Sequence, residues 1–487
     1  MTQYQNQSIL ISNLLTDIGY GKQMIAFRRK IYKDITAENY NNEIHSGLSI
    51  NRFVVGSKAE GVTAPLENDL DVMEVLPDAV CKEHSNLVAH EEQHQFKLVL
   101  EHSRPGYSLL RTVIICNRLP TATLFYESMV ELAPNSLYLS SDFLKNKMKN
   151  LRIEISRLPG NQEYINVKEE TQGPSVVSNR LALTSEDDVM ALKCECPGYL
   201  SSWICRSRNY QWPPAAVIRE VSSLDSHVVP VGHTASFFQF LEWRICFTKG
   251  EIKLVHSLND CLTKVFILLK QIPKVTLKPL SKDMSTYLMK NVVFWLAELN
   301  DYNYFTQHAL LIALKKALAY LKHFVVTNNF PSYMIPQRNL LEGKLTHSQR
   351  IKICMRIDSL LKEGPYIVLK IAKIRTAFSI LYRSPTEFNR VSKNLHEIQI
   401  IIHFIDYIHL SVQQIPRTFG EMMRIMLTNR KLRFLLVRLH LHMCDINNET
   451  LSYEDIEELY NTLNIPESID CDIQNDEKML QLVSYLT

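Results

Sequence analysis

Residues 56–76 read GSKAEGVTAPLENDLDVMEVL, and no other stretch predicts as much about the chain. The apolar run Phe53-Val54-Val55 precedes Gly56-Ser57, so the pattern predicts a short strand followed by a glycine turn. Such a turn brings backbone N–H groups and a serine hydroxyl close to an anion. The sequence therefore predicts a phosphate site at this turn.

Residues 69–76, DLDVMEVL, alternate polar and apolar positions with the period of a half-buried strand. Asp69 and Asp71 are therefore expected to project from one face. Two carboxylates at this spacing can hold hard cations such as Mg²⁺ or Mn²⁺, which stabilise the attacking and leaving oxygens in phosphoryl or nucleotidyl transfer. A lone D-x-D motif is most often solvated. A Gly-Ser turn that is followed about a dozen residues later by D-x-D on a second strand is a much more specific pattern.

Composition narrows the class of protein. With 487 residues and 46% hydrophobic content, the chain is expected to fold into two or three domains. Only 14 glycines are present, which favours helices, and a net charge of +3 requires any nucleic-acid binding to depend on a local basic surface. Ten scattered cysteines, no signal peptide and no apolar run near the roughly 20 residues of a membrane span predict a reduced, cytoplasmic protein.

The periodicity predicts an α+β fold. One or two long helices are expected over residues 8–35, strands at 96–100, 109–115, 137–139 and 176–183, and a helix at 141–158. Helical spacing then dominates residues 259–444, and two further helical segments, 453–463 and 477–486, lie in an acidic tail for which we have no functional account.

Residues 185–192, SEDDVMAL, are expected to supply a third carboxylate. A third acid could bind metal and help to accept the proton of an attacking hydroxyl group. Periodicity does not separate Asp187 from Glu186 or Asp188, and an acidic loop ahead of a strand is the alternative interpretation.

Two motifs carry a family resemblance. Residues 56–76 resemble the core motif of cyclic GMP-AMP synthases and the wider Mab-21 domain family, and residues 203–213, WICRSRNYQWP, resemble that family's W-x-x-R-x-R-x-x-x-W-P pattern. The usual upstream Trp-Pro is replaced by Cys196-Pro197-Gly198. Without the family, the tryptophans would be core anchors. The resemblance covers roughly residues 8–410 and implies a bilobal nucleotidyltransferase fold, with a spine helix on a mixed-sheet catalytic lobe and a helical bundle lobe.

Residue roles follow from the resemblance. It implies that Asp69, Asp71 and Asp187 hold two Mg²⁺ or Mn²⁺ ions and that Gly56 and Ser57 hold a triphosphate. The domains implied are residues 1–200, 201–415 and 416–487, with the strand 243–247 belonging to either of the first two.

Further nucleotide contacts are expected in the second half of the chain. Arg244 in LEWRICF is expected to contact a base or phosphate, although a structural ion pair is as common for such an arginine. Ser285 and Tyr287 in STY resemble residues that line the nucleotide site, where the tyrosine ring stacks on a base. A tyrosine buried in the core is an equally common interpretation of this pattern. No structural zinc is expected, since the relevant span holds only Cys246, His256 and Cys261 without paired spacing.

The activity implied is that of a cyclic GMP-AMP synthase-like receptor, which joins ATP and GTP into a cyclic dinucleotide as an innate immune, antiviral signal. The bases, the linkage and the activating ligand stay open. Double-stranded RNA is the expected activator, with no membrane partner and with dimerisation on the ligand. Basic residues at helical spacing are expected to form the RNA-binding face: Lys22, Arg29, Lys33, Lys145, Lys149 and Arg152. The rivals are a non-catalytic Mab-21 interaction protein with a vestigial cleft and an enzyme that extends RNA ends.

Overall fold

The computed structural model describes residues 3–38, 42–44, 48–63, 67, 69–83, 93–101, 103–157, 165–180 and 184–411. The tail segments expected at 453–463 and 477–486, and the part of the expected strand at 181–183, lie outside these ranges.

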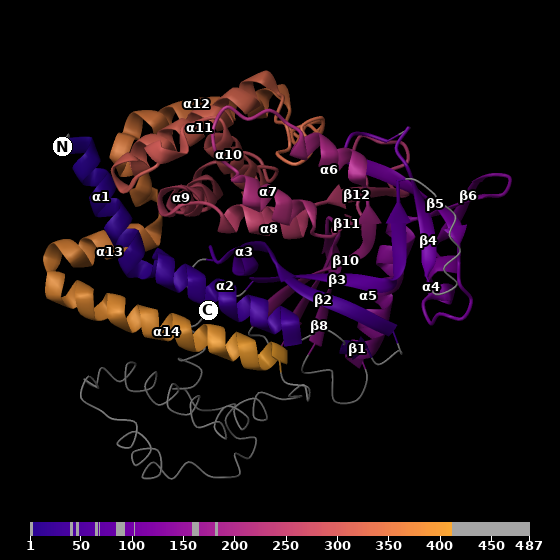
Figure 1. Cartoon of the computed structure of the whole chain (residues 1–487). Helices are drawn as coiled ribbons and strands as arrows, with labels where there is room; N and C mark the ends of the chain where they lie inside the picture. Colours follow the sequence, from indigo (N-terminus) through magenta and orange to yellow (C-terminus); the bar gives the residue numbers. More distant parts are fainter. Residues whose placement is uncertain are drawn as a thin grey trace, which may run out of the picture.

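Strands gather on one side of the ribbon and helices on the other (Figure 1). The strands are β1 Asn42–Ile44, β2 Leu48–Val55, β3 Asp69–Lys82, β4 His94–Val99, β5 Tyr107–Ile114, β6 Met129–Ala133, β7 Ser136–Leu139, β8 Ile165–Gln172, β9 Ser175–Arg180, β10 Thr184–Glu195, β11 Ser226–Val229 and β12 Glu242–Cys246. The helices are α1 Gln3–Leu15, η1 Thr16–Tyr20, α2 Lys22–Glu38, α3 Gly56–Glu60, α4 Ala122–Tyr126, α5 Ser141–Arg157, α6 Pro197–Ile204, α7 Ala215–Ser222, α8 Thr248–His256, α9 Asp260–Thr276, α10 Thr286–Glu298, η2 Tyr302–Tyr304, η3 Gln307–Ala309, α11 Leu310–Thr327, α12 His347–Glu363, η4 Gly364–Lys370, α13 Ala372–Arg383 and α14 Pro385–Ser411. The fold is therefore mixed α and β, as predicted.

Two parallel strands, β3 and β10, form the centre of the sheet and are paired along most of their length. Beside their first halves lie β2 and β9, and beside their second halves lie β4 and β11. Pairing continues from β4 through β5 and β12 to β11, so six strands form a closed ring. The strand over residues 243–247, whose domain the sequence leaves open, thus belongs to this sheet as β12.

The two faces of β3 and β10 have different partners because side chains alternate along a strand. On one face, Leu70 and Val72 pack with Val54 against α2. On the other, Met73 and Val75 pack with Ala191, and this cluster extends to Ile252 of α8. The acidic residues near the starts of β3 and β10 are divided between the same two faces.

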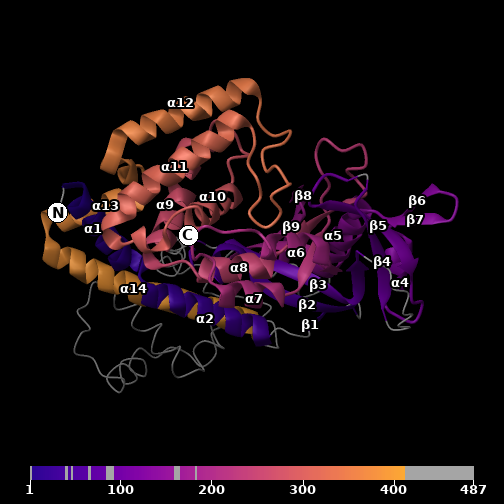
Figure 2. The ribbon, with the colours of Figure 1, turned by 45° about the horizontal axis from the view of Figure 1, so that its top comes forward.

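The helical segment over residues 8–35, predicted as one or two long helices, forms two, α1 and α2, with a break between them. The first ends at Leu15, the second begins at Lys22, and the chain leaves helical geometry at Ile18 and Gly19, where Gly19 has φ +98°. Helix α14 lies along α2 in both ribbon views (Figures 1 and 2). Arg28 of α2 contacts residues of α14 that lie 371 and 375 positions later, so the broken helix is covered by a segment that is distant in the sequence.

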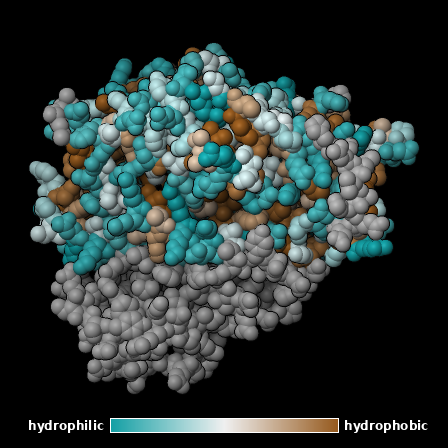
Figure 3. Space-filling model, in the orientation of Figure 1, coloured by the Kyte–Doolittle hydropathy of each residue, from teal (hydrophilic) through white to brown (hydrophobic). Residues whose placement is uncertain are grey.

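One apolar core continues from the sheet into the helices, and it includes Trp203, Trp212 and Trp243, all fully buried. The prediction that the tryptophans at 203 and 212 are core anchors is confirmed. On the face shown in Figure 3, hydrophilic side chains predominate and hydrophobic ones form scattered patches. No helix in the described ranges is long and apolar enough to cross a membrane.

Candidate functional site

Three acids meet where β3 and β10 begin. Asp187 of β10 is the direct partner of Asp71 on β3, and Ser185 is the partner of Asp69. Side chains at paired positions of neighbouring strands lie on the same face, about 4.8 Å apart across the sheet. The register therefore brings Asp69, Asp71 and Asp187 to one face, the combination that the sequence predicts as metal ligands.

Gly56 lies directly against this group. It has φ +63°, and a Cβ at this position would overlap Oδ2 of Asp71. Only glycine fits, for reasons of both backbone and space. The predicted turn lies at the start of the short helix α3, so Gly56 and Ser57 are the first residues of a helix beside the acids. No described residue forms a hydrogen bond with the hydroxyl group of Ser57.

The electrostatics of the three acids favour a cation. Burial, and then repulsion from the carboxylates of Asp187, Glu60 and Asp69, raise the pKa of Asp71 to about 7. Among the described residues, no three acidic, histidine or cysteine side chains already form a metal-binding group. The donor set nevertheless fits a hard dication, which would relieve the repulsion and complete its shell with water or phosphate oxygens.

Glu186 and Asp188 point to the opposite face. Both are buried and pair with Arg52, whose Nη2 lies 3.1 Å from Oδ1 of Asp188. Arg152 of α5 pairs with Asp188 at 2.6 Å and with Glu74. The two arginines thus pair with three buried carboxylates behind the site. The geometry favours Asp187 among the three acids that the sequence leaves open.

Helix α10 reaches the site through a lysine that the sequence analysis missed. Nζ of Lys290 lies 3.0 Å from a carboxylate oxygen of Glu60 and 2.8 Å from one of Glu251. The hydroxyl group of Tyr287 donates to Glu251 at 2.9 Å. This chain of contacts joins α3 to α8 and α10. It occupies the hydroxyl group of Tyr287, the residue whose ring is predicted to stack on a base. Only the lysine's spacing of three residues from Tyr287 in α10 could have indicated it.

Helix α9 contributes a second missed lysine. Nζ of Lys270 donates to the carbonyl of Val62 at 3.3 Å, and its charge lowers the pKa of Asp71. Burial lowers the pKa of Lys270 itself. A buried cation within range of three carboxylates is suited to contact a phosphate chain. Nothing in the surrounding apolar helix pattern separates this lysine from a solvated one.

Arg244 lies on the same face as the acids, two strands away. It is paired across β12 and β5 with Tyr107, and the guanidinium of Arg338 lies 5.1 Å from the centre of the Tyr107 ring. Arg338 donates to the Tyr107 hydroxyl at 3.4 Å, and Lys344 lies within electrostatic range of both arginines. Within the described ranges these three cations form no ion pair with a carboxylate. Arg338 and Lys344 are further residues that the sequence analysis missed.

Ser285 directly precedes α10 and is exposed, and its side chain does not cap the helix. It lies two residues before Tyr287, as predicted, but its hydroxyl group has no described protein partner. Its assignment to the nucleotide site stays a prediction.

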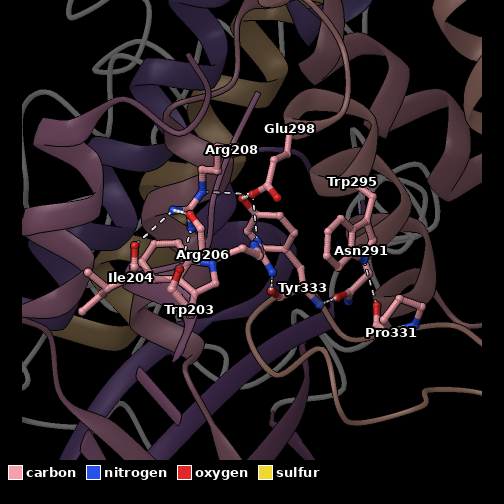
Figure 4. Close-up of polar contacts among 9 residues, drawn as sticks. All are labelled: Trp203, Ile204, Arg206, Arg208, Asn291, Trp295, Glu298, Pro331 and Tyr333. Atoms are coloured by element: carbon pink, nitrogen blue, oxygen red, sulfur yellow. Dashed lines mark hydrogen bonds and ion pairs between the residues drawn. The ribbon is translucent and has the colours of Figure 1, made fainter. Parts of the chain in front are cut away.

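The second sequence motif forms a buried polar cluster instead of a site (Figure 4). Glu298 accepts hydrogen bonds from Arg206 at 2.8 Å, Arg208 at 3.1 Å and the Tyr333 hydroxyl at 2.6 Å. Arg206 also lies 4.7 Å from the centre of the Trp295 ring. The motif therefore joins the segment between β10 and β11 to α10 and to the loop that carries Tyr333.

The helical part of this arrangement has a known counterpart. Residues 243–359 match the family model described as the Mab-21 protein HhH/H2TH-like domain. This segment is similar to a Mab-21 domain. This match confirms the predicted resemblance to the Mab-21 domain family. The matched segment includes Lys270 and Lys290, which reach Asp71 and Glu60 from α9 and α10. It also includes a second group beside β12. This second group consists of Arg244, Tyr287, Arg338 and Lys344. The acids and the Gly-Ser turn come from the sheet before the matched segment.

The basic face expected for RNA needs correction at two positions. Arg29 points inward and donates from Nε to the carbonyl of Glu60 at 3.0 Å, and burial lowers its pKa to about 10. Arg152 is engaged behind the acids, as described above. Lys145 pairs with Asp142 of its own helix. Spacing on a helix predicts which residues share a stripe, but it does not predict which stripe is buried.

We expect the stability of the metal-free protein to depend on the ionisation of Asp71. Because its pKa rises from 3.8 to about 7 on folding, ionisation opposes folding as the pH rises through that interval. Without metal, Asp71→Asn should therefore raise the melting temperature at pH 8 and leave it unchanged at pH 4. Thermal denaturation in a chelator measures this, with exposed Asp69→Asn for comparison. A lower melting temperature for Asp71→Asn at pH 8 would contradict the assignment.

Proposed function

We propose that this protein is a metal-dependent nucleotidyltransferase that joins two nucleoside triphosphates, ATP and GTP, into a cyclic dinucleotide. The observation that carries the proposal is the pairing of Asp187 with Asp71 beside Gly56, because it gathers three acids and a glycine turn on one face. The proposed architecture is that of two lobes, with substrate between the sheet and the Mab-21 domain.

Asp69, Asp71 and Asp187 would hold Mg²⁺ or Mn²⁺. A dication there supplies charge stabilisation for the attacking hydroxyl and the departing pyrophosphate. The hydroxyl group of Ser57 and the first N–H groups of α3 would donate to the triphosphate. Lys270 is placed to neutralise phosphate charge from the other side.

The second nucleotide would lie along the same face toward Arg244. Tyr287 offers a ring for stacking, and Arg244 and Arg338 offer positive charge that forms no ion pair with a carboxylate of the described residues. Lys344 adds a third cation, which lies within electrostatic range of Asp283. Oxygen-rich polyphosphate is the natural partner of such a group. The missing zinc-binding pattern and the base preferences stay predictions.

The direct test is an assay of the purified full chain with four labelled triphosphates, Mg²⁺ or Mn²⁺ and a panel of nucleic acids. A phosphatase-resistant dinucleotide that is absent with Asp71→Asn supports the proposal. Label on the ends of RNA would instead identify an RNA-extending enzyme. Nucleotide binding without any product would identify a non-catalytic Mab-21 interaction protein.

We propose that double-stranded RNA activates the protein by binding to exposed lysines of α2. Lys22, Lys30 and Lys33 are exposed and lie within one stripe of the helix. Lys30 replaces Arg29, whose side chain donates to the carbonyl of Glu60. Contacts with phosphates carry little sequence information, so duplex length and shape would decide the response. Dimerisation on RNA belongs to the same proposal.

We expect glutamate at positions 22, 30 and 33 together to abolish activation by RNA and to flatten its salt dependence. Basal Mn²⁺-driven synthesis should be unchanged, because none of the three contacts the acids. A matched control carries glutamate at three exposed lysines of α11 and α12: Lys316, Lys352 and Lys362. A triple variant that responds to duplex RNA like the parent would place the ligand surface elsewhere.

A further inference from the structure

The short helix α3, which carries Gly56 and Ser57, is held at its end by other helices. The last carbonyls of a helix lack intrahelical partners and must find donors elsewhere. Here four consecutive carbonyls each accept from a side chain of α2, α8 or α9. The pairs are Ala59 with His256 at 2.9 Å, Glu60 with Arg29 at 3.0 Å, Gly61 with Arg28 at 3.3 Å and Val62 with Lys270 at 3.3 Å.

Arg28 differs from the other donors because it is completely buried and none of its hydrogen bonds goes to a carboxylate of the described residues. Nη1 donates to Gly61, and Nη2 donates to the carbonyl of Gly19 at 2.8 Å. Burial lowers the pKa of Arg28 to about 10, so the guanidinium is still charged at neutral pH. A buried charge without an opposite charge depends entirely on the number and geometry of its neutral acceptors.

Helix α14 supplies the two remaining acceptors. Gln399 Oε1 accepts from Nη2 of Arg28, and His403 Nε2 accepts from Nε at 3.3 Å. Because Nε2 accepts, Nδ1 carries the ring hydrogen and donates to the hydroxyl oxygen of Tyr32 at 2.9 Å. The two residues are four apart on α14 and therefore lie on one side of the helix.

The break in the N-terminal helix is shaped to receive α14. A Cβ on Gly19 would overlap the amide group of Gln399, so the break admits Gln399 only because this residue is glycine. Gln399 also donates to the carbonyl of Ile18, and His396 donates to that of Thr16 at 3.3 Å. The carbonyls that the break leaves open are thus satisfied by the helix that completes the environment of Arg28.

We propose that Arg28 is a positioning residue for the phosphate-binding turn and that α14, through Gln399 and His403, keeps it in place. The proposal rests on the proposed function only in calling this turn phosphate-binding. Without both acceptors the guanidinium would have to reach water, and the carbonyl of Gly61 would lose its donor. Val62, which donates its N–H to the carbonyl of Ser57 at 3.0 Å, would be released with it. Helix α14, outside the matched Mab-21 domain, would thus act on Ser57.

The test is hydrogen exchange of the amides at residues 57–63 in the full chain carrying Gln399→Leu and His403→Leu. Loss of two hydrogen bonds to a charged group is expected to speed exchange there by about tenfold or more, while β3 and β10 keep their protection. The matched control is Ser392→Ala, which removes a contact of α14 with the break but none with Arg28. Rescue is expected from Gln399→Glu with His403→Gln, because both replacements accept hydrogen bonds.

Nucleotide affinity gives a second measurement. The Leu variant should bind a fluorescent ATP analogue with Mg²⁺ several-fold more weakly, and the rescued variant should bind as the parent does. Unchanged exchange at 57–63, or an equal rise throughout the sheet, would overturn the proposal. If the parent binds no nucleotide, the proposed function fails, but the exchange result still decides the role of Arg28. If the Leu pair does not fold, Gln399→Met alone decides in the same assay.

Discussion

Asp187→Asn is expected to lower the rate of dinucleotide synthesis by about a thousandfold or more, whereas Asp188→Asn should keep it within about tenfold. An amide cannot replace a carboxylate opposite a dication, and Asp187 shares the face of Asp71. Asp188 instead pairs with Arg52 and Arg152, so its loss should appear as lower stability.

Initial rates with saturating triphosphates and the free energy of unfolding in urea measure the two effects. Asp142→Asn, which changes an acid at the start of α5, is the matched control for loss of one charge. Binding of Mn²⁺ followed by its electron spin resonance adds a measurement independent of turnover. Loss of Mn²⁺ binding in Asp188→Asn and its retention in Asp187→Asn would reverse the assignment.

Glu298→Ala is expected to have the largest effect on stability, about 3–5 kcal/mol of unfolding free energy, because it leaves two partly buried arginines without their anion. Its Oε2 accepts from Arg206 and Arg208, which lie 92 and 90 residues earlier in the sequence, and from Tyr333, which lies 35 residues later. The cluster joins the sheet to the Mab-21 domain, so its loss should also reduce the cooperativity of unfolding.

Chemical denaturation followed by circular dichroism measures this. The matched control is Asp358→Ala, which breaks an exposed ion pair with Lys322 and should cost only about 0–1 kcal/mol. A cost for Glu298→Ala as small as that of the control would show that the arginines find other acceptors or water.

Much of the fold was predictable because local patterns fix it. The alternation in DLDVMEVL gives β3, and the apolar spacing after residue 259 gives the helices of the Mab-21 domain. The prediction that Gly56 lies in a turn close to a site was also local, since glycine after an apolar run has few other uses. These features depend on residues adjacent in the sequence.

Features that depend on distant segments were not predictable. Which of three consecutive acids enters the site is decided by pairing with β3, and whether Arg29 or Arg152 meets solvent is decided by α3 and β10. Lys270 and Lys290 look like ordinary helical lysines until their helices are packed beside Glu60. Long-range packing decides the direction of each of these side chains.

The alternating acids of β10 also bear on how the sheet finds its register during folding. Glu186, Asp187 and Asp188 are chemically similar, so attraction to metal alone would not distinguish one alignment from the next. If β10 moved by one residue along β3, Asp187 would replace Glu186 and Asp188 on this face, and Arg52 and Arg152 would share two carboxylates, those of Asp187 and Glu74, in place of three. The ion pairs of the two arginines thus favour the observed strand register over its neighbours. A one-residue deletion early in β10 would disturb both faces of the sheet at once.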